Sequence, residues 1–369
     1  MPEQRKLTEA QIIVLSLIKK ALQPLGQLEV HSSVNWKEVI DIMVAHGVAG
    51  LCFEVVEQIQ KEVQPKGEDL LTWYGHTSMM EATYGSHKAV IVQLADIFNK
   101  EGIKMNLMKG YGLSLNWPVP NHRPCADIDV FPRKADESAW EEVNNIAERK
   151  GEEIDSDNPH HSQFYFDGIL IENHKTLLDV NKIASSQEYE NLLESLIENH
   201  TLEVKIDNAT FSVISGKLAM IHLLRHSAED FGVSCLSLRQ LVDWAMLVKA
   251  YHGETDWKWV YKIAENFNMH RFLSSLNGVC VRYLGMDKEM FPSKYSDILL
   301  EDRIIRDIMD PEFNIEMPPV SDKLRYAIVA IRRTFANRWK EKIIHREGLG
   351  KIICSRGWNR TKDLFLKKN

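Results

Sequence analysis

The apolar positions of the chain follow two different periods, which divide the sequence into three stretches. Apolar residues recur every three to four positions from Thr8 to about Gln60 and from Leu70 to about Lys100, and this spacing returns after Ser215. Such a period is typical of helices with one buried face. In the last stretch, the clearest helices are predicted at residues 218–226, 238–251, 257–267 and 272–283.

The middle stretch carries short apolar runs bounded by turn-forming residues, a pattern that predicts strands. Strands are predicted at residues 103–108, 125–131, 163–166 and 169–174, and on both sides of Asp207-Asn208. Asp167-Gly168 favours a tight hairpin turn between the third and fourth of these strands. A short helix is predicted between the first two strands, and a charged helix follows from about Lys134 to Lys150.

Strands gathered between two helical stretches predict an α+β fold. Beyond Pro318-Pro319, lysines and arginines far outnumber acidic residues, which sets the end of the chain apart. We therefore predict four parts: a helical N-terminal region (1–100), an α/β core (101–215), a helical C-terminal domain (216–318) and a basic helical tail (319–369).

Two aspartates stand two positions apart in one of the predicted strands. In the segment Cys125 to Phe131, Asp127 and Asp129 project from one face, because side chains alternate along a strand, while Ile128 and Val130 point to the other. Two neighbouring carboxylates repel each other, and a bound cation relieves that repulsion. Hard divalent ions such as Mg²⁺ take oxygen ligands of this kind.

Glu172 supplies a third acid in the strand predicted at residues 169–174, about forty residues further on. A helix and a hairpin fit between the two segments, so Glu172 is predicted on a strand beside the aspartate strand. Three such carboxylates can hold two metal ions about 4 Å apart for in-line phosphoryl transfer. His174 shares the face of Glu172.

Lys109-Gly110 follows the first predicted strand and begins the short helix. Backbone N–H groups and a lysine at such a turn can contact a phosphate. A turn from strand to helix also needs glycine for conformational reasons alone, so both interpretations stay open. Arg123 likewise has two interpretations: it contacts a phosphate, or it pairs with an aspartate.

Composition narrows the class of protein. The chain has 44% hydrophobic and 26% charged residues and a net charge of -7, which is typical of a globular protein and unsuited to coating nucleic acid. The five cysteines form no C-x-x-C pair, which disfavours a disulfide framework or a thiolate zinc site. We expect neither a secretion signal nor a membrane span, and a cytoplasmic location.

Lys109-Gly110, then Pro118, Pro120 and Arg123, then Asp127-Ile128-Asp129, resemble the signature of the uncharacterised nucleotidyltransferase family within the polymerase-beta-like superfamily. The resemblance extends from about Trp36 to Leu284 and includes a helical stretch at residues 238–244; the basic tail lies outside it. It implies a small mixed sheet with flanking helices and helical additions on both sides.

The resemblance also implies an activity: metal-dependent transfer of a nucleoside monophosphate from a nucleoside triphosphate (NTP) to an unknown acceptor, releasing pyrophosphate. Asp127, Asp129 and Glu172 are then catalytic residues and ligands of Mg²⁺ or Mn²⁺, while Lys109, Gly110 and Arg123 bind the nucleotide. The superfamily at large has Gly-Ser at the phosphate turn and most often aspartate as the third acid. The alternative is therefore a catalytically degenerate nucleotide-sensing or protein-interaction module.

Several histidines and one charged pair carry further hypotheses. His160-His161 lies in a predicted loop and, with Glu172 and His174, predicts a nitrogen-rich metal site suited to hydrolysis. His222 and His226 stand four apart on a helix, where packing or a place in the substrate pocket competes with metal binding. Arg239 and Asp243, also four apart, predict a surface or half-buried salt bridge within one helix, with a place near the active cleft as the alternative.

The basic tail predicts a partner of its own, either a polyanion such as RNA or another protein. The acceptor of the transfer, whether a small molecule, a sugar, a protein or an RNA end, is not defined by any of these residues, and neither is the preferred base.

Overall fold

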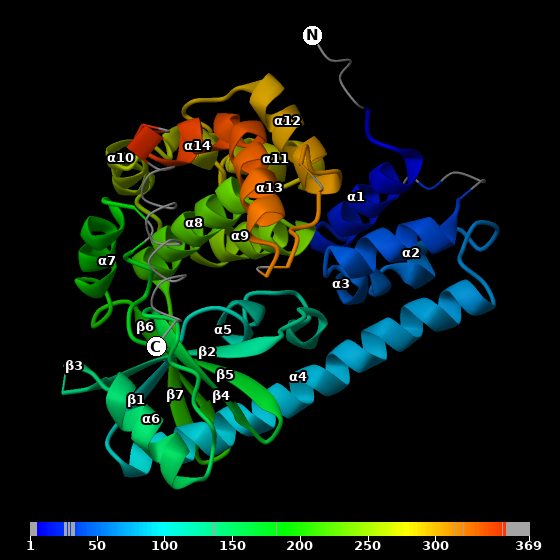
Figure 1. The fold of residues 1–369 in the computed structure, drawn as a ribbon. Coiled ribbons are helices and arrows are strands. Elements are labelled where there is room, and N and C mark those ends of the chain that lie inside the picture. Colours follow the sequence, from blue (N-terminus) through cyan, green and yellow to red (C-terminus); the bar gives the residue numbers. More distant parts are fainter. Residues whose placement is uncertain are drawn as a thin grey trace.

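The computed structural model describes residues 6–351 except residues 26, 27, 29, 31–33, 136, 182, 314, 320 and 349 (Figure 1). One mixed sheet, built from the middle of the sequence, lies between helices from both ends of the chain. The predicted α+β fold class is therefore confirmed.

The described residues before the sheet are mainly helical. They are α1 (Glu9–Leu22), α2 (Trp36–Ala45), α3 (Ala49–Phe53), the 3-10 helix η1 (Val56–Gln58) and α4 (Glu68–Lys100). Thr8 and Gln11 form a capping box at the start of α1, which satisfies backbone N–H groups that the helix leaves unpaired. After α4 the chain turns at Gly102, which has a φ of 71°.

The sheet has the strand order β4-β5-β2-β1-β7-β6, with β3 paired to β2. Its strands are β1 (Lys104–Leu107), β2 (Asp127–Lys134), β3 (Glu137–Ser138), β4 (His161–Phe166), β5 (Ile169–His174), β6 (Thr201–Ile206) and β7 (Ala209–Ile214). β2 runs antiparallel to β1 and parallel to β5. The predicted hairpin turn is confirmed, because Asp167 and Gly168 have φ values of 48° and 76°.

The helices that follow the first strand are α5 (Tyr111–Ser114), η2 (Pro120–His122), α6 (Trp140–Arg149), α7 (Ser186–Glu194), α8 (Gly216–Val233), α9 (Leu238–Tyr251), α10 (Trp257–Asn266), α11 (His270–Leu284), α12 (Ile298–Met309), α13 (Lys323–Ala336) and α14 (Arg338–Ile344). The four helices predicted most clearly after Ser215 correspond to α8 to α11. None of the helices in the described ranges combines the length and the apolar content that crossing a lipid bilayer requires.

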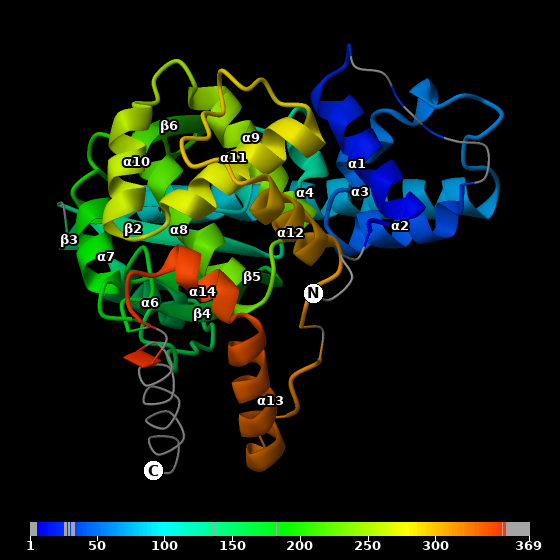
Figure 2. The ribbon, with the colours of Figure 1, turned by 90° about the horizontal axis from the view of Figure 1, so that it is seen from above.

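The start of the basic tail divides into two helices with different surroundings. α13 projects from the body of the protein (Figure 2). α14 packs against α8 and α11, and Ile343 and Ile344 are buried. Lys340 is fully buried and its Nζ lies 2.6 Å from Oδ2 of Asp307. Part of the basic region therefore belongs to the core; residues 352–369 of the predicted tail lie outside the described residues.

The described residues form two hydrophobic cores. The first joins α1 to α3 with the helices that follow the sheet, and the second joins one face of the sheet to α4 and α6. α4 belongs to both, since Trp73 is buried in the first core and Ile91, Leu94 and Phe98 in the second (Figure 1). Helices from both ends of the chain share the first core. The division of the sequence into four parts remains a prediction.

Candidate active site

The register of the sheet brings the predicted acids together. β2 and β5 pair in parallel with Asp129 opposite Glu172 and Asp127 opposite Leu170. Asp127, Asp129 and Glu172 therefore share one face of the sheet. On the other face, Ile128, Val130 and Ile171 are buried in the second core. The alternation seen in the sequence thus places the carboxylates on the face opposite that core.

Asp129 is the most enclosed of the three acids, with 5% of its side chain exposed. Its Oδ1 lies 3.1 Å from Nζ of Lys109 and 3.0 Å from Nε2 of His174. Burial alone would raise the pKa of Asp129, but these two groups hold it well below its usual value. Asp129 is therefore ionised, with both contacts concentrated on one oxygen.

Asp127 and Glu172 differ from Asp129 in their surroundings. Burial raises the pKa of Asp127, and the charges of Asp129 and Glu172 raise it further. The hydrogen bond from His174 lowers the pKa of Glu172 against the opposing effect of its burial. Asp127 is thus a carboxylate whose negative charge is only partly compensated, and an added cation would stabilise it.

Gln163 is a site neighbour that the sequence interpretation missed. Its Nε2 donates to Oε1 of Glu172 at 2.7 Å and orients that carboxylate. The signal was present in the hairpin: the two-residue turn pairs Phe166 with Ile169, and counting back along both strands places Gln163 opposite Glu172.

Lys109 and Gly110 form the turn that precedes α5. Gly110 has a φ of 49°, and a Cβ there would lie 3.4 Å from the backbone oxygen of Asp127 and 3.9 Å from Oδ2 of Asp129. Glycine is therefore favoured by the positive φ, whereas a Cβ would meet β2 only at ordinary van der Waals distance. The four-residue α5 is too short to act as an anion-binding helix, so any phosphate contact here depends on Lys109 and the turn itself.

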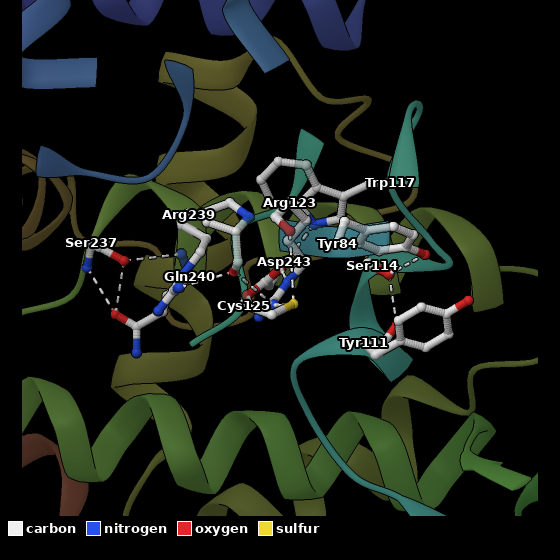
Figure 3. A network of polar contacts seen from close by, with 11 residues as sticks. Tyr84, Tyr111, Ser114, Trp117, Arg123, Cys125, Ser237, Arg239, Gln240 and Asp243 are labelled. Atoms are coloured by element: carbon white, nitrogen blue, oxygen red, sulfur yellow. Dashed lines mark hydrogen bonds and ion pairs between the residues drawn. The ribbon is translucent and has the colours of Figure 1, made fainter. Parts of the chain in front are cut away.

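Arg123 is held by an aspartate, which is the second of the two interpretations that the sequence left open. Its Nε and Nη2 donate to Oδ1 and Oδ2 of Asp243 at 2.7 and 2.9 Å, and Trp117 donates to the same carboxylate at 2.8 Å (Figure 3). The predicted salt bridge between Arg239 and Asp243 is wrong, because Asp243 is taken by Arg123. Arg239 instead donates to the backbone oxygen of Pro124 at 3.1 Å.

The position of Arg239 gives it an electrostatic role that its helix spacing did not predict. Figure 3 shows it beside Arg123 and Cys125, at the segment that leads into β2. Its positive charge lowers the pKa of Asp127, as the charge of Lys109 does, although burial and the neighbouring acids outweigh both.

The two helical histidines of α8 have separate partners. Nε2 of His222 lies 3.2 Å from the backbone oxygen of Leu177, and Nε2 of His226 lies 3.3 Å from Oδ2 of Asp230. Burial, followed by the charge of Lys109, lowers the pKa of His222 to about 4. The bond of His222 to the backbone favours the packing interpretation, and the effect of the Lys109 charge on its pKa places this part of α8 near Lys109.

His160, His161 and His174 gather beside the acids. The ring centroid of His174 lies 4.8 Å from that of His160 and 5.2 Å from that of His161. Two groups of possible metal ligands result, His160 with His161 and His174, and Asp129 with Glu172 and His174, each with its ligand atoms within 4.8 Å of one another. His174 belongs to both groups.

Comparison with known families gives a match over most of the chain. The model of the family described as uncharacterised nucleotidyltransferase matches residues 32–285. The chain therefore belongs to this family, and its membership supports a role in nucleotidyl transfer. Comparison with curated proteins and with solved structures gave no match.

Proposed function

We propose that the protein transfers a nucleoside monophosphate from an NTP to an acceptor hydroxyl. The acceptor oxygen forms a bond to the α-phosphorus, the bond between that phosphorus and the bridging oxygen breaks, and pyrophosphate leaves with the electron pair. The observation that carries the proposal is the convergence of Asp127, Asp129 and Glu172 on one face of the sheet. The raised pKa of Asp127, whose charge is only partly compensated, supports a cation there.

The donor set fits a hard divalent ion, because carboxylate oxygens are the ligands that Mg²⁺ and Mn²⁺ prefer. Asp127, Asp129 and Glu172 would hold it. When bound, such ions neutralise charge on the phosphates and on the attacking and leaving oxygens. NTPs and Mg²⁺ are both abundant in the cytoplasm, where we propose that the protein acts.

The protein's own groups have separate tasks in this proposal. Glu172, oriented by Gln163, accepts the proton of the acceptor hydroxyl. Lys109 exchanges its contact with Asp129 for the phosphates of the nucleotide, and the Gly110 turn lets the backbone approach them. Arg123 acts indirectly, since its bonds to Asp243 fix the segment that leads into β2.

Calorimetry tests the site. Each of the four NTPs is titrated with Mg²⁺ into the wild type and into Asp127→Asn/Asp129→Asn; we expect metal-dependent binding that the double variant loses. The control is Asp41→Asn/Asp96→Asn, because these side chains are 65% and 55% exposed and lie on α2 and α4. Equal binding by the site variant and the wild type would refute the assignment.

A second candidate is a degenerate module that binds an NTP without turnover. It is favoured by the contact of Lys109 with Asp129, which places an ammonium beside an oxygen assigned to a metal. Pyrophosphate release separates the two candidates. Tight Mg²⁺-dependent NTP binding without pyrophosphate release, across acceptors of several chemical classes, would favour the module.

For the basic tail we propose a polyanionic partner such as RNA, in preference to a protein. Arg325 and Arg332 are exposed on α13, which carries no acidic residue. Truncation after Pro319 would remove the buried Ile343 and Ile344, so substitution is the better test. Arg325→Ala/Arg332→Ala should weaken RNA binding and flatten its salt dependence. An unchanged salt dependence would count against RNA and favour a protein partner.

A further inference from the structure

The protons on two histidines can be assigned from their partners. Nε2 of His174 lies 3.0 Å from Oδ1 of Asp129 and 3.4 Å from Oε2 of Glu172, so it carries a hydrogen. Nδ1 of His160 lies 2.7 Å from Oγ1 of Thr176, whose own hydrogen is donated to the backbone oxygen of Leu178. Nδ1 of His160 must therefore donate, which leaves a lone pair on its Nε2.

These assignments leave an unusual contact between the two rings. Nε2 of His160 lies 3.2 Å from Nδ1 of His174. With the hydrogen of neutral His174 on Nε2, both facing nitrogens carry lone pairs, which repel each other at this distance. The contact becomes favourable when a cation lies between them, either a proton on His174 or a metal ion.

The distance matches metal coordination. Two nitrogens bound at about 2.0–2.1 Å to a tetrahedral Zn²⁺ lie about 3.3 Å apart. A third imidazole is in place, since one nitrogen of His161 lies within 4.8 Å of the ligand atoms of His160 and His174. Nδ1 of His161 is buried without a hydrogen-bond partner in the part of the chain that the structure describes.

His174 has the outer partner that metal-bound histidines commonly use, a carboxylate, and His160 has a hydroxyl in the corresponding place. Asp129 accepts the hydrogen on the far nitrogen of His174, and Thr176 does the same for His160. Such partners fix the tautomer, aim the lone pair at the metal and make the nitrogen a stronger ligand.

We propose that His160, His161 and His174 bind a borderline divalent ion of the Zn²⁺ class, at a site separate from the oxygen ligands proposed for Mg²⁺. Imidazole nitrogens select such ions over Mg²⁺, so the two sites differ in the metal that they take. Asp129 connects them, because it lies behind His174 and beside Asp127. The proposal concerns metal binding in the absence of nucleotide and does not depend on nucleotidyl transfer.

Calorimetry with ZnCl₂ alone, on the full chain freed of metal by chelation, tests the site. We expect one Zn²⁺ per chain, and loss of this binding in His160→Ala/His161→Ala. The matched control is His76→Ala/His252→Ala, which changes one histidine on α4 and one in the turn after α9. Co²⁺ should bind in place of Zn²⁺ with the visible absorption of a tetrahedral ion, which the histidine variant lacks.

A gentler variant separates a binding role from a folding role. Thr176→Val keeps the shape of the side chain and removes the acceptor behind His160; it should weaken Zn²⁺ binding roughly 10- to 100-fold. Thr255→Val, which loses a comparable bond to the backbone oxygen of Tyr251, should not. Stoichiometric Zn²⁺ binding that survives in His160→Ala/His161→Ala would overturn the proposal.

Absence of stoichiometric Zn²⁺ binding to the wild type would overturn it as well, and NMR of the ring nitrogens would then show His174 protonated on both at neutral pH. The Mg²⁺ and NTP titration described above reports on the neighbouring acids, so failure of one site is distinguishable from failure of the other.

Discussion

Asp129 and Asp243 are both buried carboxylates beside a cation, yet their partners differ in kind. Asp243 receives three donors, two from the planar guanidinium of Arg123 and one from Trp117, spread over both oxygens. Asp129 receives single contacts from Lys109 and His174, both on Oδ1. The planar guanidinium of Arg123 bonds both oxygens of its carboxylate. The contacts to Asp129 use one oxygen and leave the other to bind a ligand. The pair at Asp243 therefore has a structural role, whereas the contacts at Asp129 can be exchanged for contacts to a ligand.

The largest expected effect follows from removing the closed pair. Asp243→Ala leaves the Arg123 guanidinium buried without its counter-charge, so the free energy of unfolding should fall by about 3–5 kcal/mol. Urea denaturation followed by circular dichroism measures it. Asp41→Ala, at an exposed pair with Lys37, should change the same quantity by less than about 1 kcal/mol. Equal effects of the two variants would remove the contrast.

Glu190 tests what burial does to a carboxylate that has no lysine or arginine partner among the described residues. It is 1% exposed and accepts the backbone N–H groups of Leu177 and Leu178. Burial raises its pKa to about 7 from 4.5. The folded state therefore binds a proton that the unfolded state has lost, so stability falls as pH rises between these values.

Over that range the loss should reach at most about 3 kcal/mol, and Glu190→Gln should abolish it. Thermal unfolding at a series of pH values provides the measurement. The exposed Glu203→Gln should keep the slope of the wild type. A slope that persists in Glu190→Gln would assign the pH dependence to another group.

The smallest effect concerns Asp127. Because its pKa is raised, its ionised form costs stability at neutral pH, and Asp127→Asn should raise the free energy of unfolding by about 1 kcal/mol. The gain should fade as pH falls, since the wild type then protonates Asp127. Mg²⁺ affinity of the wild type should fall in the same range. Asp127→Asn that is less stable than the wild type at neutral pH would contradict this assignment.

The local part of the site follows from the sequence, whereas its long-range part does not. Alternation places Asp127 and Asp129 on one face, and the Asp167-Gly168 turn defines which residues face each other in the hairpin. Both depend on neighbours in the chain. The partner of Arg123 lies 120 positions away, where no period or turn relates the two residues. The helix spacing favoured Arg239 as the partner of Asp243, but the distant Arg123 bonds both of its oxygens.

The extent of α4 was visible in the sequence, but its place in two cores was not. A helical period from Leu70 to Lys100 says which residues share a face and not what covers each half. The fate of the basic region shows the same limit, because its lysines predict exposure and Lys340 is buried against Asp307. Burial of a charge depends on a partner from another element, which composition cannot supply.

The continuity of α4 has a consequence for dissecting the chain. Its 33 residues span about 50 Å without a break, with Trp73 seated at one end and Phe98 at the other. A protease or a truncation that cuts between them leaves each fragment with half of a helix and an uncovered apolar surface. The sheet with its acids is therefore not a separable unit, and tests of the candidate site should use the intact chain.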